Sequence, residues 1–132
     1  MKELRCIVFS DAEVAAAVTD RRRRISEPFP AGSVGRVDYL VEDTVRTRLS
    51  ILGEDGATTE IVLEEPEVTA ALVSYCMNRK VPLPAGSEKM LYVIRDALTL
   101  MITLNFNRAP RLAVETAIRS AVRDRPSLRA VG

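Results

Sequence analysis

The sequence of 132 residues contains no histidine and no tryptophan, and aromatic residues make up only 5% of it. Without histidine, the chain lacks the commonest general base at neutral pH, and Ser-His-Asp, Cys-His and histidine metal sites are excluded. The chain also contains no Walker loop, no GxGxxG motif and no calcium loop. We therefore expect a protein that is not an enzyme and that carries no cofactor.

A strong charge of one sign and a cysteine framework are also missing. The net charge is +1, so no overall field attracts nucleic acid or an anionic membrane. The two cysteines, Cys6 and Cys76, are too far apart for a zinc motif, and we expect them to be buried free thiols. No apolar run has the length of a signal peptide or of a membrane span. These features predict a soluble, cytoplasmic protein without membrane contact.

Acidic residues gather between positions 54 and 67, with no basic residue among them. Carboxylates of this kind can bind a hard cation such as Mg²⁺. The same pattern is typical of a solvated hairpin followed by a helix N-terminus, where negative charge opposes the helix dipole. We favour the second interpretation and expect no metal.

The most informative feature that is present is an internal repeat with an offset of 54 residues (61 − 7 = 54). Eleven of the 27 positions in 7–33 are identical in 61–87. Chance would give about two matches at average residue frequencies. The clearest stretch is Pro-x-Pro-Ala-Gly-Ser, which occurs at 28–33 and again at 82–87. The chain is therefore built from two copies of one unit.

Each copy has the pattern of a strand, a helix and a two-stranded hairpin. In the first copy, an apolar strand over residues 4–9 is followed by Ser10 and Glu13, which predict a capping box and a helix over residues 11–24. The proline-rich connector then ends the helix. Alternation with period two follows in both copies and predicts strands. In the last strand, the outward positions are Thr99, Met101, Thr103 and Asn105, between Leu98, Leu100, Ile102 and Leu104.

These patterns predict an α+β fold made of a tandem β-α-β-β repeat. The repeats cover about residues 4–52 and 58–105 within a single domain of residues 1–132. We expect a mostly antiparallel six-stranded sheet with the two repeat helices packed on it. A C-terminal helix is expected at about 110–124. Its apolar face consists of Val114, Ala117, Ile118, Ala121 and Val122.

This order of elements is similar to the layout of the vicinal oxygen chelate enzymes, whose modules carry one more strand each. Those enzymes bind metal through histidine and glutamate, so the resemblance would imply a metal site. The absence of histidine argues against that chemistry in this chain.

A run of basic residues near the end of the first helix is the clearest candidate for anion binding. The run consists of Arg21, Arg22, Arg23 and Arg24. The equivalent positions 75–78 are uncharged, so the repeat unit does not require it. We interpret the run as a solvated helix C-terminus, where cations oppose the dipole. The alternative function is a nucleic-acid or anionic-ligand binding protein that uses this run.

The second copy has more apolar side chains at outward positions than the first. Exposed apolar patches mark partner sites, and most soluble oligomers are symmetric. We therefore expect a non-catalytic binding or regulatory module that acts through protein–protein contacts, as a homodimer and with a protein partner still to be identified. The expected interface residues are Tyr75, Met77, Met101, Ile118 and Val122. A third possibility is an enzyme or small-molecule binder with a pocket lined by Tyr39, Tyr75 or Tyr92.

Overall fold

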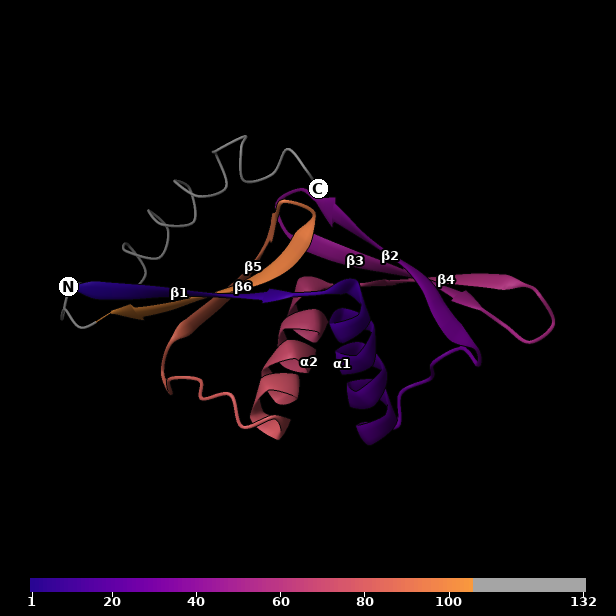
Figure 1. The fold of residues 1–132 in the computed structure, drawn as a ribbon, viewed down its shortest axis with the longest axis horizontal. Coiled ribbons are helices and arrows are strands. Elements are labelled where there is room, and N and C mark those ends of the chain that lie inside the picture. Colours follow the sequence, from indigo (N-terminus) through magenta and orange to yellow (C-terminus); the bar gives the residue numbers. More distant parts are fainter. Residues whose placement is uncertain (106–132) are drawn as a thin grey trace.

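The computed structural model of the chain describes residues 1–105 and shows an α+β protein with two helices and six antiparallel strands (Figure 1). Both halves have the expected β-α-β-β order. The elements are β1 (Lys2–Phe9), α1 (Asp11–Arg24), β2 (Ser33–Val41), β3 (Val45–Leu52), β4 (Thr58–Leu63), α2 (Glu65–Asn78), β5 (Glu88–Ile94) and β6 (Ala97–Asn105). The helix expected at about 110–124 lies outside the described residues.

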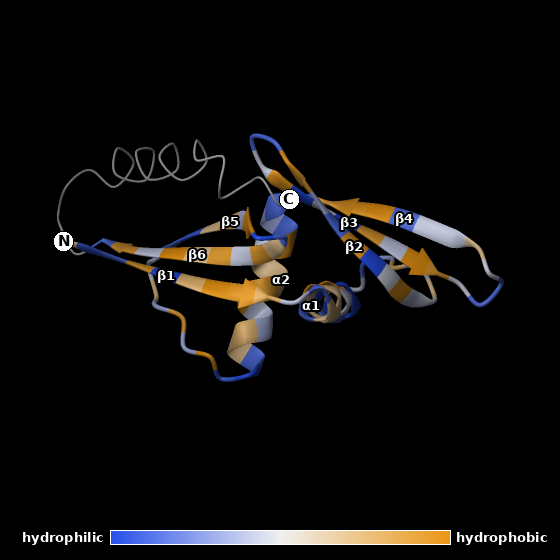
Figure 2. Ribbon diagram, turned by 45° about the horizontal axis from the view of Figure 1, so that its top comes forward, coloured by the Kyte–Doolittle hydropathy of each residue, from blue (hydrophilic) through white to orange (hydrophobic). Residues whose placement is uncertain are grey.

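The six strands form two separate three-stranded sheets, so the expectation of one six-stranded sheet is wrong. Sheet A has the strand order β1-β6-β5, and sheet B has the order β2-β3-β4. The sheets approach each other where β3 contacts β5, and α1 and α2 lie side by side between them (Figures 1 and 2). Two sheets form because each side of the helix pair has apolar residues to bury, and one sheet covers only one side.

Each sheet combines strands from both repeats. In sheet A, β1 pairs with β6 of the second repeat, and Lys2 lies opposite Asn105. In sheet B, β4 pairs with β3 of the first repeat, and Leu63 lies opposite Thr47. The first strand of each repeat is therefore exchanged onto the hairpin of the other. Neither repeat completes a sheet with its own strands.

The two helices occupy equivalent positions in the repeats, because their first and last residues differ by the same offset (65 − 11 = 54 and 78 − 24 = 54). The expected capping box is confirmed. The Ser10 hydroxyl accepts a hydrogen bond from the Glu13 N–H at 3.2 Å, and the Ser10 N–H donates to the Glu13 carboxylate at 2.9 Å. In α2, a proline in the first turn takes the place of this box.

Both helices also end in the same backbone motif. Ser26 and Lys80, which are 54 residues apart, have positive φ angles of 56° and 59°. The N–H of the next residue, Glu27, donates to the Arg22 carbonyl at 2.9 Å, and the equivalent bond joins Val81 to Cys76. These are the long hydrogen bonds of a Schellman motif, which uses a left-handed residue to end a helix.

The hairpins of the two repeats differ in length, and their turns differ by one residue. Val41 pairs with Val45 in the first hairpin, whereas Ile94 pairs directly with Ala97 across a two-residue turn in the second. Both residues of the shorter turn have positive φ, as a type I′ turn requires. Leu98 lies opposite Phe9, and Thr47 lies opposite Leu63, the equivalent of Phe9, so the repeat offset falls from 54 to 51 in the last strand (98 − 47 = 51).

The hydrophobic core lies between the helices and the inner faces of the two sheets. Every second residue of β3 is buried, as the alternation predicted. Apolar residues follow the strands of both sheets (Figure 2). The fully buried side chains include Val14 and Val18 of α1, Val68 and Leu72 of α2, Val45 and Leu49 of β3, and Leu98, Leu100 and Ile102 of β6.

Acidic side chains at the start of each helix connect the helices to the strands. The carboxylate of Glu65 accepts hydrogen bonds from the backbone N–H of Val45 in sheet B, at 2.8 Å, and of Leu91 in sheet A, at 3.5 Å. The equivalent residue of α1, Asp11, accepts a bond from the Tyr39 hydroxyl at 3.1 Å. Burial raises the pKa of the Tyr39 phenol, and the charge of Asp11 adds to the rise. Glu65 thus connects the two sheets.

Neither helix in residues 1–105 has the length and apolar character needed to cross a membrane.

Candidate functional site

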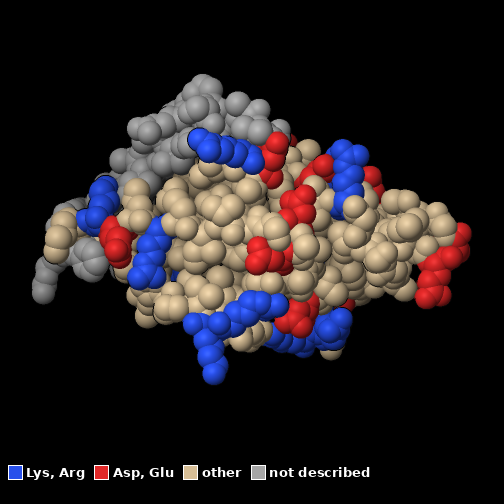
Figure 3. Space-filling model, viewed as in Figure 1, with Lys and Arg blue, Asp and Glu red and all other residues tan. Residues whose placement is uncertain are grey.

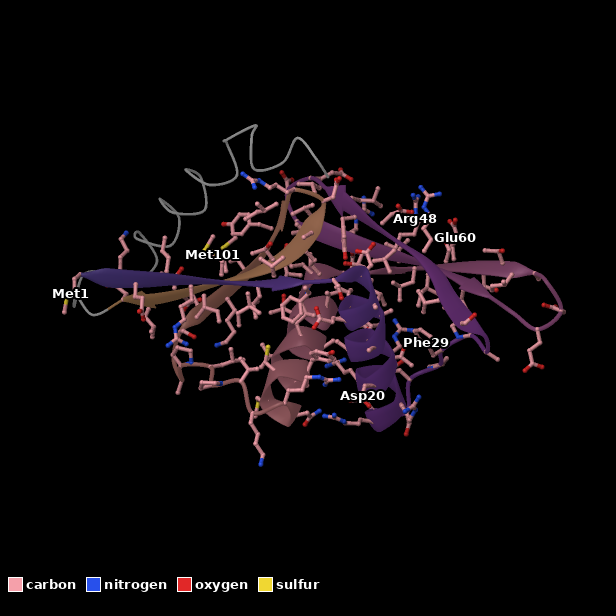
Figure 4. All side chains as sticks on the ribbon, in the orientation of Figure 1. Met1, Asp20, Phe29, Arg48, Glu60 and Met101 are labelled. Carbon is pink, nitrogen blue, oxygen red and sulfur yellow. The ribbon has the colours of Figure 1, made fainter. Side chains whose placement is uncertain are left out.

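The structure places the expected interface residues at separate points. Met101 lies on the outer face of β6 and is only 8% exposed (Figure 4). Tyr75 is half-buried on α2, where its ring packs edge-on against Phe9 and under the guanidinium of Arg79, 3.5 Å from the ring centre. Met77, which is 65% exposed, projects from the end of α2. Ile118 and Val122 lie outside the described residues. The described members therefore do not form one continuous patch.

The arginine run is divided between structural and exposed positions. Arg22 forms a two-pronged ion pair with Glu67 of α2, at 2.7 and 3.1 Å, and also donates to the Pro28 carbonyl at 2.8 Å. Arg24 pairs with Asp20 of its own helix at 2.6 Å. Arg22 therefore fixes α1 against α2, and it is not a freely solvated cation. Arg21 and Arg23 remain as candidates for anion binding.

An open groove of about 710 Å³ lies beside α1 and the end of α2. Small α1 residues line it, together with Arg23, Arg79 and the acidic Asp20, which Figure 4 labels. Basic and acidic side chains also alternate over the face of the molecule in Figure 3, where no uninterrupted basic surface is seen. The groove therefore lacks the single sign of charge that would favour a polyanion.

The three tyrosines considered for an enclosed pocket do not meet. Tyr39 bonds to Asp11, Tyr75 lines the open groove, and Tyr92 is buried on the outer face of sheet A. Within residues 1–105, no group of three or more acidic, cysteine or histidine side chains is arranged to hold a metal ion. The three tyrosines therefore do not line one enclosed pocket.

One of the two edges of sheet A is the most distinctive exposed feature of residues 1–105. Strand order places β1 at this edge, and its side chains at positions 4, 6 and 8 share the outer face. Leu4 is 48% exposed and Val8 is 61% exposed. The equivalent positions of β4 carry the more polar set Thr58, Glu60 and Val62. A long exposed edge strand with apolar side chains is a template for pairing with another strand.

The two cysteines differ in accessibility. Cys76 is buried as expected, but Cys6 is exposed, because it lies on the outer face of the edge strand β1. The Cys6 thiol donates a weak hydrogen bond to the Met101 sulfur at 3.4 Å. Burial raises the pKa of the Cys76 thiol, and the Glu13 carboxylate adds to the rise. A raised thiol pKa reduces the reactive thiolate fraction at neutral pH.

We expect the two thiols to react at very different rates with an aromatic disulfide reagent. Cys6 should react as fast as a free thiol, and Cys76 roughly a hundred times more slowly, because its reaction requires local opening of the core. Absorbance at neutral pH should show one thiol per chain that reacts quickly and one that reacts slowly. In denaturant, both thiols should react quickly. A Cys6→Ser variant that keeps the fast phase would contradict this assignment.

Comparisons of the chain with protein-family models, with curated proteins and with solved structures give no match.

Proposed function

We propose that the protein is a non-catalytic binding module that works through protein–protein contacts, and that it forms a homodimer by antiparallel pairing of β1 with β1 of a second copy. The observation that carries the proposal is the exposed apolar edge of sheet A. Pairing across this edge would satisfy its unpaired backbone groups and join two copies of sheet A into one six-stranded sheet. Leu4 would also become buried against the partner.

The charges of β1 favour one register for this pairing. Glu3 and Arg5 flank Leu4, and both are about half-exposed. In an antiparallel pair, the numbers of opposed residues have a constant sum. When the twofold axis passes through Leu4 this sum is 8 (4 + 4 = 8), so Glu3 of each copy lies opposite Arg5 of the other (3 + 5 = 8). Directly opposed charges of opposite sign stabilise an antiparallel pair by about 0.2–1 kcal/mol, and like charges destabilise it. The sequence of β1 is thus complementary to itself.

A charge exchange tests the pairing. Glu3→Arg places arginine opposite arginine at two symmetric points and should raise the dimer dissociation constant by about tenfold or more. The double variant Glu3→Arg/Arg5→Glu restores both ion pairs in the reversed direction and should recover the original constant. Sedimentation velocity over a dilution series measures the dimer dissociation constants of the single and the double variant. A double variant as weak as the single one would refute this register.

A second pair of variants tests the edge itself. Leu4→Asp brings two carboxylates together at the axis and should weaken the dimer by about a hundredfold. Thr58→Asp, at the equivalent position of β4 (58 − 4 = 54), should leave it unchanged. A wild-type protein that is monomeric at every concentration would overturn the proposal.

A further variant tests the alternative function, binding of nucleic acid or an anionic ligand by the arginine run. The triple variant Arg21→Ser/Arg23→Ser/Arg24→Ser keeps the structural Arg22 and should leave the dimer intact, since exposed charges contribute little individually. Binding of random-sequence DNA that weakens steeply with salt and is lost in this variant would favour the alternative instead.

A further inference from the structure

Three side chains that contain sulfur form a row across the outer face of sheet A. Cys6 of β1 lies opposite Met101 of the central strand β6, and Met101 lies opposite Met90 of β5. Residues directly opposite each other in an antiparallel sheet share a face, with Cβ atoms about 4.5–5.5 Å apart. The row therefore brings together one of the two cysteines and two of the four methionines of the chain.

Two contacts hold the sulfur atoms in this row. The Cys6 sulfur lies 3.4 Å from the Met101 sulfur, and the Met101 side chain lies on the side of sheet A away from the helices (Figure 4). At the other end of the row, the Tyr92 hydroxyl donates a weak hydrogen bond to the Met90 sulfur at 3.6 Å. Sequence spacing gives no sign of this arrangement, because Cys6 and Met101 are 95 residues apart.

We propose that Cys6, Met101 and Met90 form a binding site for a soft monovalent cation, Cu(I). Thiolate and thioether sulfurs are the ligands that favour Cu(I). Two sulfurs 3.4 Å apart can both lie at a usual metal–sulfur distance of about 2.3 Å from one ion. The cation replaces the thiol proton of Cys6, and the proton passes to solvent. The complex is then neutral, because the two methionines carry no charge.

The surroundings of the row also suit a cation. On the same face, each sulfur residue is flanked by the residues two positions before and after it in its strand. The flanking residues are Leu4, Val8, Thr99, Thr103, Glu88 and Tyr92. None of these six has a positive charge that would repel the ion. Because Cys6 is exposed, the ion can reach the row from the β1 edge.

The ligand set distinguishes this site from a site for a harder metal. Structural Zn²⁺ sites use four ligands from cysteine, histidine and carboxylate groups. The chain has no histidine, and Cys76 is buried in the core, so the row has a single thiolate. The site also stands independently of the proposed dimer, because the Cys6 sulfur faces Met101 of its own chain.

Titration of the full chain with Cu(I), without oxygen and against a coloured Cu(I) chelator, provides the first test. We expect one ion per chain, and loss of binding in Cys6→Ser. Met90→Leu and Met101→Leu, which nearly conserve side-chain volume, should each weaken binding by about tenfold or more. Met77→Leu, at an exposed methionine on α2, should have no effect. Wild-type affinity in Cys6→Ser, or in both variants of the row methionines, would overturn the proposal.

X-ray absorption at the copper edge provides a second test, which reads the ligands directly. The loaded wild type should show three sulfur neighbours and no nitrogen or oxygen neighbour, and Met101→Leu should show two. Bound Cu(I) should also protect Cys6 from alkylation, as followed by peptide mass spectrometry. A single sulfur neighbour, or one ion shared by two chains, would refute the site.

Discussion

Replacing Gly32 by alanine is expected to destabilise the protein by about 3 kcal/mol or more. This effect is large for a substitution that adds one methyl group and removes no interaction. Gly32 has a φ of +134°, a conformation that side chains rarely adopt. A Cβ at this position would lie 2.2 Å from the Leu52 carbonyl oxygen and 2.8 Å from its carbonyl carbon. Both atoms belong to the backbone at the end of β3. Alanine can fit only if the start of β2 separates from β3.

The second copy of the motif supplies a matched control. Gly86 also has a positive φ, of +71°, but nothing lies within 4 Å of the position its Cβ would take. Gly86→Ala should therefore cost only about 1 kcal/mol, from backbone strain alone. Urea unfolding of the two variants measures the difference in the free energy of unfolding. Equal losses would show that the close approach at Leu52 does not exist.

Replacing Glu65 by alanine is expected to cost about 3 kcal/mol, because it removes the acceptor of two backbone N–H groups in different sheets. Val45 and Leu91, which carry these groups, are buried, so water cannot easily replace the carboxylate. An unsatisfied buried donor costs about 1–3 kcal/mol. The loss should be accompanied by faster hydrogen exchange at both amides, since the connection between the sheets is weakened.

Two further variants separate this connection from the general effect of a negative charge at a helix start. Glu64 is the neighbouring N-cap residue, and its side chain makes no capping hydrogen bond. Glu64→Ala should therefore change stability by less than about 0.5 kcal/mol. Glu65→Gln keeps an amide oxygen as an acceptor and should lose less than Glu65→Ala. Thermal unfolding that ranks Glu64→Ala with Glu65→Ala would contradict the role assigned to Glu65.

The local elements of this fold were predictable because each depends on neighbouring residues. The Ser10–Glu13 capping box indicated the first residue of α1. The repeat offset of 54 residues places α2 at the equivalent positions. Alternation in β3 predicted its inner and outer faces. Strand partners were not predictable, because a strand such as β1 has the same alternation whether it pairs with its own hairpin or with the other. The choice between one sheet and two depends on how the helices pack.

The residues of the candidate site were harder to predict from the sequence, because their exposure and contacts depend on strand order and helix packing. The exposure of Leu4 and Val8 follows from the edge position of β1, which the pairing decides. The role of Arg22 follows from the approach of Glu67, which lies 45 residues further along the chain. Nothing in the run of four arginines distinguishes Arg22 from its neighbours. The alternation of Leu4, Cys6 and Val8 was a usable signal, but only together with the strand order.

The exchange of first strands between the repeats also has a consequence for synthesis of the protein. The partners of β1 are 89 to 103 residues away, since Phe9 pairs with Leu98 and Lys2 with Asn105 (98 − 9 = 89; 105 − 2 = 103). Because β1 precedes these partners in the chain, it must wait until nearly all of the described residues have left the ribosome. Sheet B, which is complete once β4 has emerged, can form first. Until then, the apolar strand that completes sheet A stays available to chaperones and to other nascent chains.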